Sequence, residues 1–451
     1  MKTKIKQVTI VKQGSSLLIE KPFAYVLKSK LRGELCDNCF RRRKLLKCSG
    51  CQYVYYCNRE CQKESWDDHR QECSNLRRVS PRIVPDAARL MARIILKLQR
   101  GGDLEKSYYM ETSFRKFKDL MSHYSDIKQD QKRMEHFTSL CGVLIDFIGE
   151  NNLPNSAELM GIYGRLCVNG FNILDPEMLS IGTGIYLACS VIDHSCDPTA
   201  VAVFEGTTIH IRALKVMPTL DWKKVFISYI DLLNFPKDRQ AELQATYYFL
   251  CDCRPCNNIK EIESLSLLLC PNQDCGAGIP VRQQDVGDLF QPCSCCGAHV
   301  KLDTYKEYLE VEEFTKHQLQ NMKDIAYLDV CKVCLKKQQG LFHPLDLLHV
   351  KVLDLAFESS IELGQWEQAN EYGQELVAGY QRHYKEFHPL LGIHYLKLGK
   401  INLYLKKLKE ALSMLKNAEK IIRVTHGETH TLYKDQLMSL VRQIQGEMSI
   451  T

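Results

Sequence analysis

Seven cysteines and one histidine between residues 36 and 73 have the types and the spacing of zinc ligands. They form two Cys-x2-Cys pairs, one Cys-x3-Cys pair and one His-x3-Cys pair, enough for two closed tetrahedral sites. Because no position around either ion stays open, we interpret both sites as structural, with metal binding supplying folding free energy to this short segment. The interleaved order predicts a cross-brace, with one ion bound by Cys36, Cys39, Cys57 and Cys61 and the other by Cys48, Cys51, His69 and Cys73.

The composition favours zinc sites in a reducing compartment over a disulfide framework, which is the alternative for so many cysteines. The chain has 451 residues, of which 45% are apolar, 25% are charged and 21 are cysteines. This length predicts two or three globular domains. The basic segment Met1–Val11 lacks the apolar core of a secretory signal. No run approaches the roughly 18 apolar residues of a membrane span, so we expect no membrane partner.

The net charge of +6 is mild, and its local clusters have two interpretations. The run Arg41-Arg42-Arg43-Lys44 has the chemistry to contact nucleic acid. It also lies beside zinc ligands, where a site of four thiolates carries a net negative charge that basic side chains offset. We favour the second interpretation, so nucleic acid is not the expected partner.

Two more cysteine groups lie downstream. Cys251, Cys253 and Cys256 supply three ligands in a Cys-x-Cys-x2-Cys pattern, and the remote Cys196 is the candidate for the fourth. Two later pairs, each followed by glycine, predict a small zinc ribbon and leave Cys295 as a spare; they are Cys270 with Cys275 and Cys293 with Cys296. The Cys331-x2-Cys334 pair has no partner pair, so we interpret it as two core cysteines.

The elements around these groups change from strand to helix along the chain. Alternation and β-branching predict strands over 201–204 and 209–213, joined by a turn at Glu205-Gly206. From about Val311 the apolar period is helical. Two similar segments, 363–369 and 405–411, suggest degenerate helical-hairpin repeats over 348–446, loosely similar to tetratricopeptide repeats. We expect His426, in Arg423-Val424-Thr425-His426-Gly427, to cap or pack a helix rather than to bind a ligand.

The finger segment resembles the MYND zinc finger in every ligand and in the short motifs Tyr55-Tyr56-Cys57 and His69-Arg70-Gln71-Glu72-Cys73. Downstream, Asp193-His194-Ser195-Cys196-Asp197-Pro198 with the Cys-x-Cys-x2-Cys loop resembles a SET domain and its post-SET zinc site. This combination is that of the SMYD family. The resemblance implies an α+β fold, in which a MYND finger and a helical insert interrupt a β-rich SET domain, followed by a post-SET loop and a helical TPR-like domain. The implied boundaries are 1–35 for a shortened N-terminal SET segment, 36–73 for the finger, 74–165 for the insert, 166–250 for the SET core, 251–300 for the post-SET loop and ribbon, and 301–451 for the helical domain.

The resemblance also implies a function, which is S-adenosylmethionine-dependent methylation of lysines in histone or other proteins. Such a site deprotonates the lysine in a narrow aromatic channel and aligns it with the methyl group. By motif position the catalytic residues are Phe171, Tyr229 and Tyr247, and the cofactor-binding residues are Gly14, His123, Asn169, Asp193, His194 and Phe249. We further expect three zinc ions with a fourth in the ribbon, proline-rich peptides at the finger, a monomer, and a location in cytoplasm and nucleus.

Four departures from the family pattern touch the expected cofactor pocket. The Gly-x-Gly loop retains only Gly14, and aspartate replaces asparagine at position 193. The Gly-Glu-Glu-Leu before the catalytic tyrosine is replaced over 219–224, and a glutamate of the insert is replaced by Met121, which cannot accept a hydrogen bond from the ribose as a carboxylate would. These departures keep a second function open, a zinc-organised interaction protein whose methyltransferase site is weakened or lost.

Overall fold

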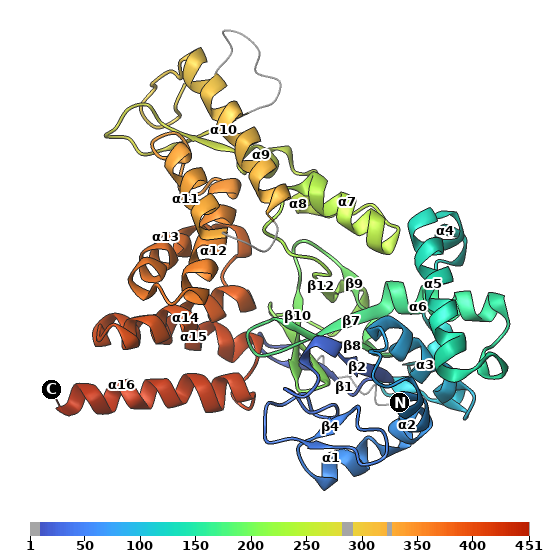
Figure 1. Cartoon of the computed structure of the whole chain (residues 1–451). Coiled ribbons are helices and arrows are strands. Elements are labelled where there is room, and N and C mark those ends of the chain that lie inside the picture. The colour runs from blue at the N-terminus through green and yellow to red at the C-terminus, as the bar shows by residue number, and fades with distance from the viewer. Residues whose placement is uncertain (1–9, 282–291, 323–326, 451) are drawn as a thin grey trace, which may run out of the picture. The chain divides into compact units, whose positions relative to one another are not determined.

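The computed structural model describes residues 10–281, 292–322 and 327–450, and it divides into two compact units (Figure 1). The first unit contains residues 1–194, 198–227 and 243–249; the second contains residues 195–197, 228–242 and 250–451. Helix α7 (Pro236–Tyr247) carries residues of both. The fold is α+β, as the sequence predicts, with small sheets beside a large helical part.

The first unit is built from short strands and a set of helices that share one core. Its strands are β1 (Ser16–Glu20), β2 (Ala24–Leu27), β3 (Leu46–Lys47), β4 (Tyr55–Tyr56), β5 (Ser107–Tyr108), β6 (Phe114–Arg115), β7 (Gly170–Leu174), β8 (Ser180–Ile185), β9 (Asp193–His194), β10 (Ala200–Glu205), β11 (Thr208–Ala213) and β12 (Phe226–Ile227). Its helices are α1 (Arg59–Glu64), α2 (Trp66–Val79), α3 (Asp86–Leu98), α4 (Tyr124–Gln129), α5 (Gln131–Ile148) and α6 (Ser156–Asn169).

Two three-stranded antiparallel sheets, in the orders β1-β11-β10 and β2-β8-β7, are the largest in this unit, beside the two-stranded sheets β12-β9, β3-β4 and β5-β6. The predicted hairpin is confirmed, since β10 and β11 pair from Ala200 with Ala213 to Glu205 with Thr208. Gly206 turns this hairpin with a φ of 63°, and a Cβ atom there would lie 2.8 Å from the carbonyl oxygen of Cys39. Only glycine meets both demands, so this turn lets the finger approach the SET strands closely.

Helix α3 is the centre of the first unit, because every residue from 88 to 95 is buried. A helix that is buried all round belongs to a core rather than to a surface. Two of these buried residues, Arg89 and Arg93, are charged and therefore need partners. The finger supplies them, which makes the finger part of the same packed unit.

The second unit contains a zinc-ligand region followed by a helical array. Its elements after α7 are α8 (Arg254–Asn257), α9 (Ile259–Glu263), β13 (Leu267–Leu269), β14 (Gly278–Pro280), α10 (Leu302–Asn321), α11 (Tyr327–Gln338), α12 (Leu347–Glu362), α13 (Trp366–Tyr384), α14 (Pro389–Tyr404), α15 (Leu408–Thr425) and α16 (Met438–Ile450). Helix formation begins at Leu302, nine residues before the predicted Val311. Its first turns already carry the buried side chains of Tyr305 and Tyr308, at a spacing of three that continues to Val311.

The two similar sequence segments have the same backbone path. Gly364 and Lys406 occupy equivalent positions, with φ of 67° and 62°. The residue after each donates its N–H to a carbonyl five positions earlier, Gln365 to Ser360 and Lys407 to Asn402, both at 2.8 Å. The alanines that follow, Ala369 and Ala411, are fully buried. The structure therefore confirms the predicted helical-hairpin repeat at the level of turn geometry.

Asp346 fastens the ribbon segment to the helical array inside the second unit. Its Oδ2 accepts hydrogen bonds from the backbone N–H of Leu267 at 2.8 Å and from the hydroxyl of Tyr308 at 2.7 Å. Its Oδ1 accepts from the N–H groups of Leu348 and His349 at the start of α12. Burial raises the pKa of this carboxyl to about 6. One N-cap residue thus joins β13, α10 and α12.

Candidate functional site

The finger places its eight predicted ligands in two groups, paired as the cross-brace requires. In each group the ligand atoms lie within 4.8 Å of one another. A tetrahedral zinc with Zn–S bonds of about 2.3 Å separates its sulfur ligands by about 3.8 Å. The Sγ atoms of Cys39 and Cys57 are 3.8 Å apart, and those of Cys48 and Cys73 are 3.9 Å apart. Both groups therefore fit a zinc ion.

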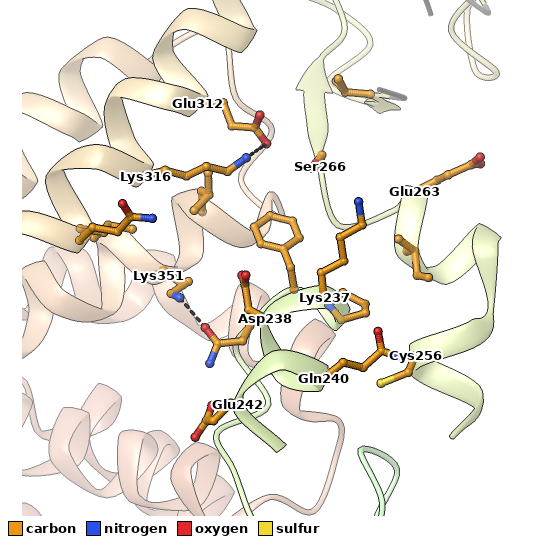
Figure 2. Close-up of a pocket in the computed structure, with 18 of the residues that line it drawn as sticks. Lys237, Asp238, Gln240, Glu242, Cys256, Glu263, Ser266, Glu312, Lys316 and Lys351 are labelled. Carbon is orange, nitrogen blue, oxygen red and sulfur yellow. Dashed lines mark hydrogen bonds and ion pairs between the residues drawn. The ribbon is translucent and has the colours of Figure 1, made fainter. Parts of the chain in front are cut away.

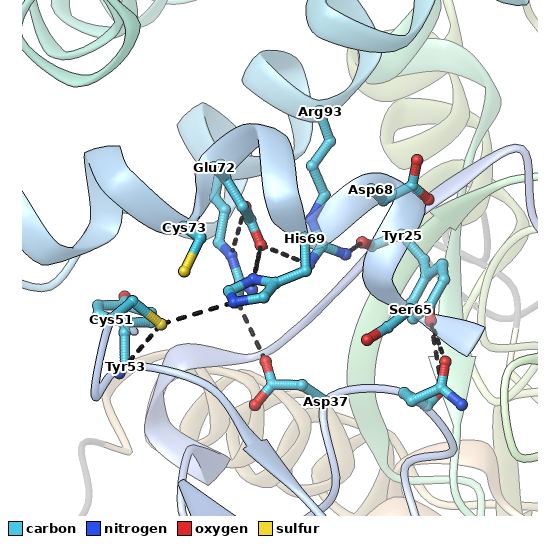
Figure 3. Close-up of polar contacts among 12 residues, drawn as sticks. Tyr25, Asp37, Cys51, Tyr53, Ser65, Asp68, His69, Glu72, Cys73 and Arg93 are labelled. Atoms are coloured by element: carbon cyan, nitrogen blue, oxygen red, sulfur yellow. Dashed lines mark hydrogen bonds and ion pairs between the residues drawn. The ribbon is translucent and has the colours of Figure 1, made fainter. Parts of the chain in front are cut away.

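A buried carboxylate connects the finger to α3 (Figure 3). The His69 Nε2 atom faces Cys48 and Cys51, while its Nδ1 lies 3.5 Å from Glu72 Oε1. Glu72 also accepts from Arg89 at 2.8 Å and from Arg93 at 2.6 Å. Burial opposes ionisation of Glu72, but the two guanidinium groups hold its pKa well below the ordinary value. A carboxylate behind a zinc-binding histidine orients the ring, so Glu72 serves the metal site and the helix together.

The network extends to the other zinc site and to the SET strands. Arg89 donates to Asp37 Oδ1 at 3.2 Å, beside the ligand Cys36. Arg93 donates to the backbone carbonyl of Tyr25 in β2 at 2.5 Å. One face of α3 therefore connects to both finger sites and to strand β2 of the first unit.

The second unit assembles the third predicted group. Cys196, Cys251, Cys253 and Cys256 bring their Sγ atoms within 4.8 Å, with 3.6 Å between Cys196 and Cys256. The buried Arg239 donates to Cys256 Sγ at 3.9 Å and to the carbonyl of Asn234 at 2.7 Å. Four thiolates around one zinc carry a net negative charge, which this guanidinium offsets. The sequence pattern did not reveal Arg239, because it lies 12 residues from the nearest ligand in the chain.

The ribbon group also comes together. The Sγ atoms of Cys270 and Cys296 are 3.5 Å apart, and those of Cys275 and Cys293 are 3.7 Å apart. The glycines that follow, Gly276 and Gly297, have φ of 62° and 72°, as the tight turn of a zinc knuckle requires. Cys295 is exposed outside the group, and Cys331 and Cys334 are buried in a separate apolar cluster.

We expect four zinc ions per chain by elemental analysis after exhaustive dialysis, because each of the four ligand groups fits a closed tetrahedral site. Cys270→Ser should lower the content by one ion. Cys295→Ser is the matched control, since it changes an exposed cysteine next to the same site, and it should keep four. A content of two would contradict the assignment of both groups in the second unit.

Four of the expected cofactor-binding residues are linked by contacts within the first unit. The Asn169 amide donates to the backbone carbonyl of Met121 at 2.8 Å, two residues before His123. The His123 ring lies 5.5 Å from the ring of Tyr248, and the next residue, Phe249, lies 6.0 Å from His194. The end of α6, the start of α4, the end of α7 and strand β9 thus meet around one place.

The remaining expected residues occupy separate positions. Asp193 is exposed in β9, which pairs in parallel with β12. Gly14 donates its N–H to the carbonyl of Ala213 at 2.7 Å, in the turn before β1. Phe171 in β7 packs edge-to-face on the buried Tyr186 at 5.6 Å, and Tyr247 ends α7. Tyr229 belongs to the second unit, in the segment that follows β12.

Comparison with known proteins identifies the family of this arrangement. The MYND finger family matches residues 36–73. The chain is 30% identical over 420 residues to N-lysine methyltransferase SMYD2-A of Xenopus laevis, a match that covers 92% of this chain and 91% of that protein. The chain belongs to the SMYD family of lysine methyltransferases. Two further relatives match almost the full chain. Histone-lysine N-methyltransferase SMYD3 of Mus musculus is 29% identical over 97% of this chain and 94% of its own length, and histone-lysine N-methyltransferase ASHR1 of Arabidopsis thaliana is 28% identical over 97% and 92%.

In this SMYD chain, Met121 and Tyr248 each contact an expected cofactor-binding residue. The side chain of Met121 is 62% exposed, while its backbone carbonyl holds Asn169. Tyr248, which the sequence reasoning passed over between Tyr247 and Phe249, is the neighbour of His123. The sequence gives little indication of this role, because an aromatic residue between two others is most simply interpreted as part of the hydrophobic core.

A groove of about 1070 Å³ lies within the second unit of this SMYD chain, between α7, α9, α10 and α12 (Figure 2). Lys316 pairs with Glu312 at 3.1 Å, and Lys351 donates to Asn234 at 2.6 Å. Asp238 and Glu242, four residues apart on α7, also line the groove. Burial and the charge of Asp231 raise the pKa of Glu242 while Lys351 opposes the shift, and acidic and basic side chains line the groove together.

A membrane-spanning helix is not among the elements of residues 10–281, 292–322 and 327–450.

Proposed function

We propose that this chain transfers methyl groups from S-adenosylmethionine to lysine side chains of histone or other proteins. The observation that carries the proposal, in a member of the SMYD family, is the ring contact of His194 with Phe249, next to the contact of Tyr248 with His123. When bound, S-adenosylmethionine supplies an electrophilic methyl group. The residues of the chain bind it, exclude water and deprotonate the acceptor.

The side chains at this place suit the parts of that cofactor. The ring faces of His123 and Phe249 suit an adenine base, since aromatic rings stack with offset faces. The exposed Asp193 side chain can accept a hydrogen bond, but it lacks the amide donor that the asparagine of the family pattern would offer. The Asn169 side chain is held by Met121 and by the carbonyl of Arg165 at 2.9 Å, so its amide oxygen has a fixed direction.

We assign the lysine channel to Phe171, Tyr229 and Tyr247. An aromatic channel disfavours the charged ammonium and so lowers the pKa of the lysine amine. The Tyr229 hydroxyl would hold the neutral amine in line with the methyl carbon. The packing of Phe171 on the fully buried Tyr186 supports a rigid wall.

The other parts of the chain would serve partners. We propose that the finger docks proline-rich peptides and that the groove of the second unit contacts the protein substrate through Asp238 and Glu242. We propose that the chain acts as a monomer in cytoplasm and nucleus, and that its zinc ions are structural.

One observation favours a second function, a zinc-organised interaction protein with a weakened methyltransferase site. Met121 points its side chain outward, where a carboxylate could accept a hydrogen bond from a cofactor and a thioether cannot. Calorimetry with S-adenosylmethionine separates the two functions, together with mass spectrometry of histones and lysine peptides incubated with the full chain. Binding and methylated lysine support the enzyme. If the chain shows neither binding nor methylation, the interaction-protein function is supported instead.

We expect Asp193→Asn to tighten S-adenosylmethionine about tenfold, because it restores a side-chain amide donor worth about one net hydrogen bond. Titration calorimetry measures the change. Asp67→Asn, on the exposed face of α2, is the matched control and should leave the affinity unchanged. Weaker binding by Asp193→Asn would instead show that the carboxylate pairs with the cofactor ammonium.

A further inference from the structure

Two bulky side chains in left-handed backbone conformation meet in the first unit. His123 has a φ of 45° and Tyr248 a φ of 61°, and their ring centroids are 5.5 Å apart at an interplanar angle of 31°. Bulky residues are disfavoured in this backbone conformation, which persists only where the surrounding structure enforces it. Residues with such backbone conformations cluster at functional sites, so the contact between these two residues indicates a functional role.

Both side chains are held in place by carboxylates. The Tyr248 hydroxyl donates to Asp130 Oδ2 at 3.1 Å, while Asp130 Oδ1 accepts from the N–H of Arg133 and caps α5. His123 Nδ1 lies 2.9 Å from Asp126 Oδ2. Burial and the Asp130 charge raise the pKa of Tyr248 to about 12, so the phenol remains a hydrogen-bond donor at neutral pH.

This arrangement aims the His123 ring. With Nδ1 engaged by Asp126 and one ring face covered by Tyr248, the Nε2 edge has no hydrogen-bond partner among the residues that the structure describes. The neighbours of the pair are the proposed cofactor residues, since Phe249 follows Tyr248 and the Met121 carbonyl that holds Asn169 precedes His123 by two positions. The chain has lost the carboxylate of position 121, and the fixed histidine stands in the same loop.

We propose that Tyr248 is a positioning residue for the nucleoside end of S-adenosylmethionine, acting by holding the His123 ring in its binding orientation. This inference rests on the proposed function. It explains why an aromatic residue occupies a backbone conformation that glycine or asparagine would adopt more readily. It also explains why the phenol is tied to Asp130, the N-cap of α5, which lies 118 positions away in the chain.

The test is a double-mutant cycle on the full chain, read by calorimetry with S-adenosylmethionine. Tyr248→Phe removes the Asp130 hydrogen bond and keeps the ring, and should weaken binding about tenfold. His123→Ala should weaken it further. If Tyr248 acts through His123, the double variant binds no more weakly than His123→Ala alone, because coupled residues are not additive.

A second titration uses 5′-methylthioadenosine, which lacks the amino-acid end. The Tyr248→Phe factor should be the same for this probe as for the whole cofactor, since the proposed contact lies at the nucleoside. A loss seen only with the whole cofactor would overturn the inference.

Tyr163→Phe is the matched control. Its hydroxyl is also buried and hydrogen-bonded in this region, to His136 at 2.9 Å and to the carbonyl of Arg133 at 3.2 Å. It should lower the unfolding midpoint without changing cofactor affinity. Additive losses in the cycle, or an equal loss of affinity in Tyr163→Phe, would show that Tyr248 only stabilises the fold. A parent chain that binds no S-adenosylmethionine would overturn the proposed function and this inference together, whereas binding that all Tyr248 variants retain would overturn this inference alone.

Discussion

Tyr229→Phe should lower the rate of methyl transfer by about a hundredfold to a thousandfold while leaving S-adenosylmethionine affinity little changed. Phenylalanine keeps the ring and the width of the proposed channel but deletes the hydroxyl that would hold the neutral amine. Loss of one preorganised polar contact at a transition state costs about 2.7–4 kcal/mol. Single-turnover kinetics on a lysine peptide measures the rate, and calorimetry measures the affinity.

The backbone around Tyr229 should survive the change. The Ser228 hydroxyl donates to the carbonyl of Ile230 at 2.7 Å, and Asp231 accepts from the N–H of Leu233 at 3.0 Å and from the hydroxyl of Tyr384 at 2.8 Å. Tyr404→Phe, an exposed tyrosine at the end of α14, is the matched control and should retain full activity. A Tyr229→Phe rate equal to that of the parent would remove this residue from the reaction.

Glu72→Gln should lower the free energy of unfolding of the first unit by about 3–5 kcal/mol. Removing one partner of a buried ion pair leaves the other charge uncompensated, and here the buried Arg93 would lose its carboxylate partner while Arg89 would keep only Asp37. Denaturant unfolding followed by fluorescence measures the loss. The finger should also release zinc to a chelator faster, because His69 loses the carboxylate behind its ring.

The network also predicts where the loss spreads. Arg93 joins Glu72 to the Tyr25 carbonyl, so hydrogen exchange in β2 should quicken together with exchange in the finger. Glu60→Gln, on the exposed face of α1, is the control and should change neither. Faster exchange confined to the finger would mean that the finger is a separate module rather than part of the first unit.

Local patterns made much of this fold predictable. Ligand spacing alone indicated how the finger cysteines pair, because two interleaved tetrahedral sites allow few arrangements. The β10–β11 hairpin and the paired turns at Gly364 and Lys406 also follow from short-range chemistry, alternation in one case and a repeated left-handed turn in the other. The apolar period indicated a later start for α10 than Leu302, because the buried face of its first turns is formed by Tyr305 and Tyr308, aromatic residues that also favour strands.

The contacts within the candidate site could not be predicted from local patterns in the same way. Residue types and motif positions were enough to indicate the zinc ligands, the family resemblance, and the candidate residues Asn169, His194 and Phe249. Three further contacts follow only from the packed fold: Glu72 binds Arg89 of α3, Arg239 faces Cys256, and the tilted ring of Tyr248 lies beside His123. None of these three contacts follows from a characteristic spacing between its two residues in the sequence. A buried charge or a strained ring is recognised by what surrounds it, and those surroundings exist only once distant segments have packed together.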